Sequence, residues 1–272
     1  MYGLKLLLLS LAAASAFGAE TLRVMTFNVR YPAKGDGANV WEARRDLLVE
    51  TIRSRHPDIV GTQELFQLQG DYIVSKLPDY AWFGLSRRGD HTDEHMGVFY
   101  RKDRLELVDS GNFWLSETPE TPASMSWGAD LPRMVTWGEF KDKQTGKTFR
   151  YMNTHFPHRR NDDQARTNCA RLIVERVKAL GDRTVILTGD FNAGMDSESH
   201  RVLTTALEET WTPDTKGPVG TFHGFRGTPG RDRIDWILFR GALKPKSIET
   251  ITDHQGEVYP SDHFPVLAVF EM

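Results

Sequence analysis

The chain has 272 residues, of which 39% are hydrophobic and 26% are charged, and its formal net charge is −3. This composition is that of an ordinary soluble globular protein, long enough for one large domain or two small ones. It argues against a broad basic surface that coats nucleic acid, and the presence of only one cysteine excludes an internal disulfide.

The first 19 residues differ from the rest of the chain. Lys5 precedes the apolar run Leu6–Ala13, and the small residues Ala14-Ser15-Ala16 follow it. This arrangement predicts a secretory signal peptide over residues 1–19 and a single domain over residues 20–272. The alternative is a membrane anchor, but the run is too short for a bilayer of about 30 Å. Removing the segment takes away one lysine and no acid, so the mature chain would carry a net charge of −4 and be secreted or periplasmic.

Apolar patterns along the rest of the chain predict a strand-helix-strand order that occurs twice. The first copy consists of Leu22–Asn28, Trp41–His56 and Asp58–Glu64, and the second of Phe149–His155, Gln164–Leu180 and Thr184–Asn192. Further strands are predicted over Met96–Tyr100, Met134–Phe140, Ile234–Phe239 and Val266–Phe270. Two such copies favour a core of two packed sheets with outer helices over one open parallel sheet.

Polar residues stand where several of these strands end. They are Asn28, Glu64, His155, Asp190, Asn192, Asp235, Asp262 and His263. A magnesium-dependent phosphoester hydrolase needs hard oxygen ligands and imidazoles, because the metal must keep an open side while a histidine handles protons or phosphate oxygens. A lone strand-end aspartate is more often a turn or cap residue, and a lone histidine is more often structural. Their joint occurrence favours an enzyme.

Three other motifs are incomplete. Gly146-Lys147-Thr148 resembles the end of a phosphate-binding loop, but Lys141 stands where that loop requires a glycine. The chain has no G-x-S-x-G nucleophile elbow and no H-E-x-x-H zinc motif.

Cys169 lies in an amphipathic helical stretch, so we expect a buried, inert thiol rather than a nucleophile.

Basic side chains cluster at Arg87-Arg88, at Arg159-Arg160 and within Arg226–Arg233. Each cluster could meet a single phosphate, but a solvated surface is the commoner meaning of such patterns. The polar loops Ser116–Pro132 and Thr212–Arg231 are natural places for substrate contacts.

The strand-end residues and their order resemble the endonuclease/exonuclease/phosphatase superfamily, which includes deoxyribonuclease I. The resemblance covers the chain from Leu22 to Phe270. It implies an α+β fold, the deoxyribonuclease I-like four-layered α/β/β/α sandwich. It also implies hydrolysis of a phosphoester with the help of Mg²⁺ or Mn²⁺, and leaves open whether one ion or two are bound.

The same resemblance implies a metal site. Asn28, Glu64 and Asp262 match the metal-site positions of the family, with Glu64 as the main ligand. Asp190 and Asn192 match the pair that positions and activates the attacking water, and they could help to hold a second ion.

It further implies a proton-handling group. His155 and His263 match the two catalytic histidines of the family. Asp235 matches the acid that orients His263, and Glu94 stands where the deoxyribonuclease I branch places the acid that supports His155. A carboxylate behind an imidazole fixes its tautomer and raises its basicity.

The resemblance settles the reaction class and leaves the substrate open, because nucleases, lipid phosphodiesterases and phosphatases share the fold. A nucleic acid, a phospholipid and a sugar phosphate are all compatible with export. We favour a phosphodiesterase, either one similar to nucleases and 3′–5′ exonucleases or a phospholipid phosphodiesterase. A phosphomonoesterase acting on sugar or inositol phosphates is an alternative, as is a secreted binding protein without turnover. The expected protein is a monomer without a stable protein partner.

Overall fold

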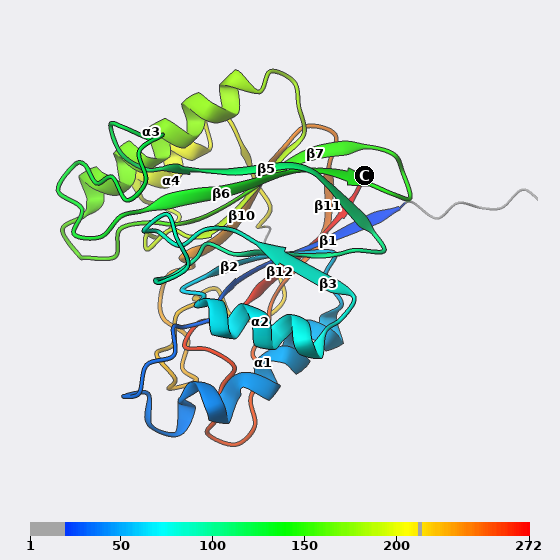
Figure 1. Cartoon of the computed structure of the whole chain (residues 1–272), viewed down its shortest axis with the longest axis vertical. Helices are drawn as coiled ribbons and strands as arrows, with labels where there is room; N and C mark the ends of the chain where they lie inside the picture. Colours follow the sequence, from blue (N-terminus) through cyan, green and yellow to red (C-terminus); the bar gives the residue numbers. More distant parts are fainter. Residues whose placement is uncertain (1–19, 212–213) are drawn as a thin grey trace, which may run out of the picture.

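The structure, a computed structural model, describes residues 20–211 and 214–272. Two six-stranded sheets pack face to face, and helices cover the outer face of each sheet (Figure 1). The predicted α+β sandwich with α/β/β/α layers is therefore confirmed. The predicted signal peptide lies outside the described residues.

The first sheet has the strand order β11-β12-β1-β2-β4-β3. Its strands are β1 (Thr21–Asn28), β2 (Ile59–Gln63), β3 (Tyr80–Phe83), β4 (Val98–Arg101), β11 (Lys244–Thr250) and β12 (Val266–Glu271). Only β1 and β2 run parallel, and the helix α1 (Trp41–Arg55) connects them. The 3-10 turn η1 (Gly37–Asn39) precedes α1, and the helix α2 (Gln67–Lys76) follows β2.

The second sheet has the strand order β5-β6-β7-β8-β10-β9. Its strands are β5 (Leu105–Trp114), β6 (Met134–Asp142), β7 (Thr148–His155), β8 (Val185–Asp190), β9 (Glu208–Glu209) and β10 (Asp235–Arg240). Here only β7 and β8 are parallel, joined by α3 (Asp163–Ala179), and the short helix α4 (Glu198–Leu203) follows β8. Each predicted strand-helix-strand copy thus forms the centre of one sheet.

The core consists of three apolar layers. The middle layer joins the two sheets through side chains such as Val24 and Ile186. The outer layers pack Leu48 and Ile52 of α1 against the first sheet, and Ile173 of α3 against the second. Because both faces of the central strands are covered, β2 and β8 are buried along their whole length, which explains why each begins with consecutive apolar residues, Ile59-Val60 and Val185-Ile186-Leu187.

A polar network links the sheets just below the end where the site lies. Gln63 Nε2 donates to Asn153 Oδ1 at 2.7 Å, and Asn153 Nδ2 donates to the Thr62 carbonyl oxygen at 2.7 Å. Gly61 lies opposite this network, and a Cβ there would approach Thr188 Oγ1 to 2.3 Å. The missing side chain of Gly61 therefore allows the two sheets to come close enough for β1 and β8 to share one site.

Several elements were absent from the sequence prediction. They are α2, α4, β3, β5, β9 and β11. The alternation of apolar and polar residues is weak in the edge strand β5, because much of this strand is exposed. Val108, for example, is 58% exposed. The helix α2 contains Gly70, and a glycine weakens the sequence pattern of a helix. Glycine is needed there because a Cβ at that position would approach the Trp82 ring to 2.6 Å. No helix in the described part of the chain is both long and apolar enough for a membrane crossing.

Candidate active site

The predicted site residues meet at one end of the sandwich. Asn28, His155 and Asp190 are the last residues of β1, β7 and β8, and Asp235 is the first residue of β10. Glu64 follows β2 directly. Both parallel pairs direct their carboxyl ends to this place, as the two-copy pattern predicts.

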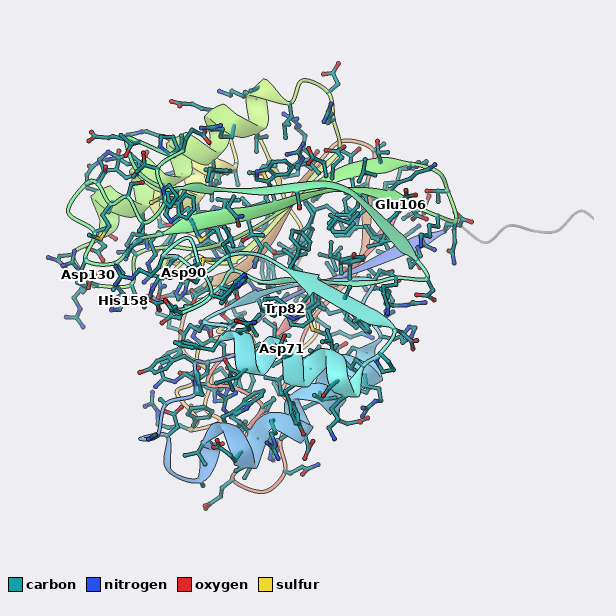
Figure 2. All side chains as sticks on the ribbon, viewed as in Figure 1. Asp71, Trp82, Asp90, Glu106, Asp130 and His158 are labelled. Carbon is teal, nitrogen blue, oxygen red and sulfur yellow. The ribbon has the colours of Figure 1, made fainter. Side chains whose placement is uncertain are left out.

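A cavity of about 730 Å³ opens at this end. The predicted residues that line it are Glu64, Glu94, His155, Asp190, Asn192, Asp262 and His263. Asn28 and Asp235 are almost completely buried and contact the lining residues from behind. Figure 2 labels His158, another lining residue, at this end of the molecule and Glu106 at the opposite end.

Asp190 occupies the centre of the polar cluster. Its Oδ2 accepts a hydrogen bond from Asn28 Nδ2 at 2.9 Å, and its Oδ1 accepts one from the Asn192 backbone N–H at 3.0 Å. His155 Nε2 lies 3.5 Å and His263 Nε2 lies 3.7 Å from the same Oδ2. Burial and the nearby Asp235 carboxylate raise the pKa of Asp190 to about 7. A carboxylate with this pKa is suited to accept a proton near neutral pH.

Asp235 and His263 form the predicted pair. Asp235 lies opposite Asp190 in the antiparallel register of β10 and β8, and its Oδ2 is 3.0 Å from His263 Nδ1. Burial alone would lower the pKa of His263, but the Asp235 and Asp190 carboxylates raise it well above its ordinary value. His263 is therefore an imidazolium at neutral pH and presents Nε2 toward Asp190.

His155 has the opposite electrostatic character. Burial, together with the positive charges of Arg133 and His263, holds the pKa of His155 well below its ordinary value. Its Nδ1 is buried and has no hydrogen-bond partner among the described residues. The two histidines on either side of Asp190 thus differ in charge, one cationic and one neutral.

The expected contact between Glu94 and His155 is wrong. Glu94 Oε2 instead accepts a hydrogen bond from Arg87 Nη1 at 2.9 Å. Burial and the charge of Glu64 raise the pKa of Glu94 to about 7. Glu94 stays in the cavity, where the guanidinium group of Arg87 outcompetes the imidazole because it carries a permanent charge.

Glu64 and Asp262 form an acidic wall beside Asn28. Glu64 Oε1 accepts a hydrogen bond from Asn28 Nδ2 at 3.0 Å, and Glu64 Oε2 accepts one from the Tyr31 backbone N–H at 3.2 Å. The guanidinium group of Arg30 is 3.8 Å from Glu64 and 3.9 Å from Asp262. Burial raises the pKa of Asp262, and the Glu64 charge adds to this effect.

These residues fit a hard divalent cation. Carboxylates are the ligands that Mg²⁺ and Mn²⁺ prefer, and the Arg30 contact leaves much of the negative charge of Glu64 and Asp262 available. Asn28 turns its Nδ2 group toward Glu64, and its Oδ1 accepts a hydrogen bond from the Arg30 backbone N–H at 3.0 Å, so the predicted role of Asn28 as a ligand is not supported by this arrangement. A second group able to hold an ion consists of Asp190, Asp235 and His263, whose ligand atoms lie within 4.8 Å of one another. Because Asp235 contacts His263 closely, we instead interpret this group as a histidine that is oriented by a carboxylate.

Sequence reasoning missed the buried arginines of the cavity. Arg133 is only 3% exposed, and its Nε and Nη1 have no hydrogen-bond partner within the described residues. Its Nη2 is 3.1 Å from His158 Nδ1, and burial lowers the pKa of its guanidinium group. Arg87 was expected on a solvated surface but is also buried against Glu94. The position of Arg133 in the sequence could have indicated its role, because it directly follows the loop predicted to contact substrate and immediately precedes β6.

The other basic clusters divide between surface and core. Arg159 pairs with Asp162 at the surface, as expected. Arg233 is only 2% exposed and lies over the Trp211 ring, so the expectation of a solvated surface is wrong at this position.

A model of the Endonuclease/Exonuclease/phosphatase family matches residues 25–263. The chain belongs to this family. The resemblance inferred from the strand-end residues is thereby confirmed, and the reaction class is hydrolysis of a phosphoester.

Relatives of known structure support this assignment over almost the whole chain. A family protein from Bacteroides thetaiotaomicron is 34% identical, with a TM-score of 0.87 and coverage of 93% of this chain and 98% of that chain. The structure of a mannosyl-6-phosphatase from the same species is also 34% identical, with a TM-score of 0.86 and coverage of 92% and 100%. Tyrosyl-DNA phosphodiesterase 2 of Danio rerio is 26% identical over 240 residues, which are 79% of this chain and 58% of that protein.

Proposed function

We propose that the protein is an exported phosphoesterase that requires a divalent cation and hydrolyses small phosphorylated sugars. The observation that carries this proposal is the buried Arg133, which lines the same cavity as Asp190 and His263 and whose Nε and Nη1 have no hydrogen-bond partner among the described residues. An unpaired buried cation is costly unless an anion binds to it, and a phosphate group supplies that anion. Similarity to a mannosyl-6-phosphatase over 92% of the chain supports a sugar phosphate as the substrate class.

The side chains divide the work of binding and activation. Asp190 accepts a proton from the water whose oxygen bonds to phosphorus, and the Asn28 amide holds the Asp190 carboxylate in place. The P–O bond to the sugar breaks in the same step, and the sugar oxygen leaves as an alcohol after it takes up a proton from solvent. The His263 imidazolium donates from Nε2 to a phosphoryl oxygen and stabilises the charge that develops there. The Arg133 guanidinium group, which lines the same cavity, adds a positive charge toward the remaining phosphoryl oxygens.

Glu64 and Asp262 would hold the cation, and the Asn28 amide group supports Glu64 by donating to its Oε1. When bound, the cation withdraws charge from the phosphoryl group and favours attack by water. The Arg30 guanidinium group keeps the two carboxylates close together before binding, since it lies within 4 Å of both. Neutral His155 lies against Asp190 and limits the positive charge next to the proton acceptor.

Aromatic side chains at the mouth of the cavity fit a ring-shaped leaving group. Phe222 is 40% exposed and its ring centroid is 5.0 Å from that of His263. Tyr31 is 36% exposed, and the Arg30 guanidinium group covers its ring at 4.2 Å. Both residues line the cavity, so a sugar ring attached to the bound phosphate would meet apolar surface.

A phosphodiesterase is the second candidate. The similarity to tyrosyl-DNA phosphodiesterase 2 and the strand-end pattern favour it. A binding protein without turnover is a weaker alternative, because such a protein has no need for both the acidic wall and the Asp235–His263 pair.

A substrate panel tests the proposal. The purified protein is assayed with mannose 6-phosphate, p-nitrophenyl phosphate and bis(p-nitrophenyl) phosphate, each with Mg²⁺, with Mn²⁺ and with a chelator. We expect turnover of the sugar phosphate that the chelator abolishes. Full turnover in the chelator would refute metal dependence, and a strong preference for the diester would favour the second candidate. Turnover of none of the substrates would leave the binding protein.

Export is tested separately. The protein is produced with its first 19 residues, and the mass of the secreted or periplasmic product is measured. We expect a chain that begins near Glu20. An intact chain retained in the cytoplasm would contradict this part of the proposal.

A further inference from the structure

Arg44 is a buried cation that the mechanism above does not use. It lies on α1 and is 0% exposed. All five of its hydrogen bonds go to backbone carbonyl oxygens, and no carboxylate lies within 4 Å of it among the described residues. Buried arginines usually pair with acids, so this arrangement requires an explanation.

The carbonyl groups that Arg44 contacts belong to two segments that are far apart in the sequence. Nη1 donates to the Val29 oxygen at 2.7 Å and to the Pro260 oxygen at 2.9 Å. Val29 follows Asn28, and Pro260 stands two residues before Asp262. One nitrogen atom therefore links the end of β1 to the segment before β12.

The remaining donors of Arg44 fix the segment after β1. Nη2 donates to the Arg30 oxygen at 2.6 Å and to the Tyr31 oxygen at 3.5 Å, and Nε donates to the Asn39 oxygen at 3.0 Å. The Arg30 side chain reaches toward Glu64 and Asp262, and the Tyr31 backbone N–H donates to Glu64. The backbone held by Arg44 thus carries the groups that surround both carboxylates.

A second contact supports the same junction. Ser261 Oγ donates to the Asn28 carbonyl oxygen at 2.6 Å. The Tyr259 backbone N–H also donates to Asn39 Oδ1 at 2.8 Å, so single bonds connect the two segments at separate points. The Arg44 guanidinium group is planar and presents its donors in a fixed fork, so it defines the orientation of the segments as well as their separation.

We propose that Arg44 is a positioning residue that holds the backbone segments of Asn28 and Asp262 in the relative position that cation binding requires. The carbonyl contacts, rather than the charge alone, carry this role. Lysine has three donors on one flexible ammonium group, so it cannot reproduce five contacts to five carbonyl oxygens. The inference rests on the cation site of the proposed function.

Arg44→Lys is the decisive variant because it keeps the positive charge and removes the fork. Arg104→Lys is a matched control. Arg104 is also a buried arginine, 5% exposed, and it pairs with Asp142 and with the carbonyl oxygen of Thr21, at the end of β1 opposite to Asn28. Both substitutions cost stability, but only Arg44→Lys should disturb the site.

Two measurements are made well below the unfolding temperature of each variant. The first is the dissociation constant of Mn²⁺, obtained from the electron paramagnetic resonance signal of the free ion. We expect it to rise about tenfold or more in Arg44→Lys, the usual effect of removing a group that supports a metal ligand. We expect less than a twofold change in Arg104→Lys.

The second measurement is amide hydrogen exchange followed by mass spectrometry, without added metal. Peptides that contain residues 28–34 and 258–264 should exchange at least tenfold faster in Arg44→Lys than in the unaltered protein or in Arg104→Lys. Wild-type exchange in these peptides, or an unchanged Mn²⁺ affinity, would overturn the proposal. If Arg44→Lys does not fold, Arg44→Gln, which retains two N–H donors, is measured in the same way.

The two readouts separate this inference from the proposed function. If the unaltered protein binds no Mn²⁺, the proposed cation site fails. The exchange rates of the two peptides still decide whether Arg44 holds the segments together.

Discussion

The two central strand-helix-strand units share one order but end differently. In the first unit Asn28 is the register partner of Gln63, so Glu64 lies one residue beyond the paired strands. In the second unit His155 and Asp190 are themselves register partners. This difference of one residue separates an end suited to bind a cation from an end suited to move a proton.

The backbone of Glu64 compensates for the extra residue. Side chains alternate between the two faces of a strand, so a residue directly after Gln63 would point away from Asn28. Glu64 has a φ of 58°, in the left-handed region that non-glycine residues seldom occupy, and its carboxylate turns back to accept the bond from Asn28. Such local strain is tolerated where function requires a particular direction of a side chain.

Asn28 joins the two ends. Its Nδ2 group donates to Glu64 at 3.0 Å and to Asp190 at 2.9 Å. The comparison therefore predicts separable roles: Glu64 acts through the cation, and Asp190 acts on the water. The Asn28 amide group connects the two carboxylates.

The largest expected effects test this division. Asp190→Asn should lose activity by a factor of about 10² or more at every metal concentration, because it removes the proton acceptor. Glu64→Gln should also be severely impaired, but added Mn²⁺ should restore part of its activity. The measurement is kcat/KM over a range of metal concentrations, with circular dichroism as the folding control. Equal recovery of both variants would show that the two ends share one role.

The Asp235–His263 pair gives the next largest effect. His263→Ala should lose more activity than Asp235→Ala, because Asp235 acts by orienting and charging His263. Residues that act as a unit have non-additive effects, so the double variant should resemble His263→Ala alone. Strictly additive losses in kcat/KM would break the pair.

Arg133 tests the anion site. Arg133→Lys keeps a charge but loses the planar set of donors, so KM for a phosphate ester should rise about tenfold, as expected for the loss of a charge-assisted hydrogen bond. The exposed Arg201, which pairs only with surface groups of its own segment, provides the control as Arg201→Lys. An unchanged KM in Arg133→Lys would remove the observation on which the proposed function depends.

The pKa of Asp190 makes a prediction about stability. Burial and Asp235 raise this pKa to about 7, above the value of about 4 in an unfolded chain. The unfolded state therefore loses its proton first, and the carboxyl group destabilises the metal-free fold increasingly as pH rises from about 4 to about 7. Asp190→Asn should have the higher unfolding temperature in a chelator at pH 8, and the difference should shrink at pH 5. A difference independent of pH would contradict this.

The sequence was sufficient for features that depend on periodicity and order. The central strands β2 and β8 begin with consecutive apolar residues because both of their faces are covered, and the polar residues at their ends are visible in the sequence. The edge elements β5 and β11 were missed because exposure weakens their pattern, and α2 because Gly70 serves the packing of Trp82.

Partners in the site were harder to predict than positions. Glu94 was identified as a site residue, yet its partner is Arg87 and not His155, because the choice depends on which cation the 84–95 segment brings near. The sequence does not indicate that Arg133 and Arg44 are buried, since burial without a carboxylate partner is visible only in three dimensions.

The smallest effect is expected at Cys169, on the helix of the second unit. Its helix α3 presents Cys169 to an apolar cluster that includes Ile173. The arginine that α3 directs to backbone carbonyl oxygens near the site is Arg166, which donates to Pro157 at 2.8 Å, much as Arg44 of α1 donates to Val29. Burial raises the pKa of the Cys169 thiol to about 12, so the native protein should not react with a thiol reagent and the unfolded protein should. Cys169→Ser should lower the free energy of unfolding by about 1–3 kcal/mol, through burial of a hydroxyl group, while kcat/KM changes less than twofold. Cys169→Ala, which buries no polar group, is the control for unfolding in denaturant. A large loss of activity in a stable Cys169→Ser protein would contradict the assignment of Cys169 as an inert core residue.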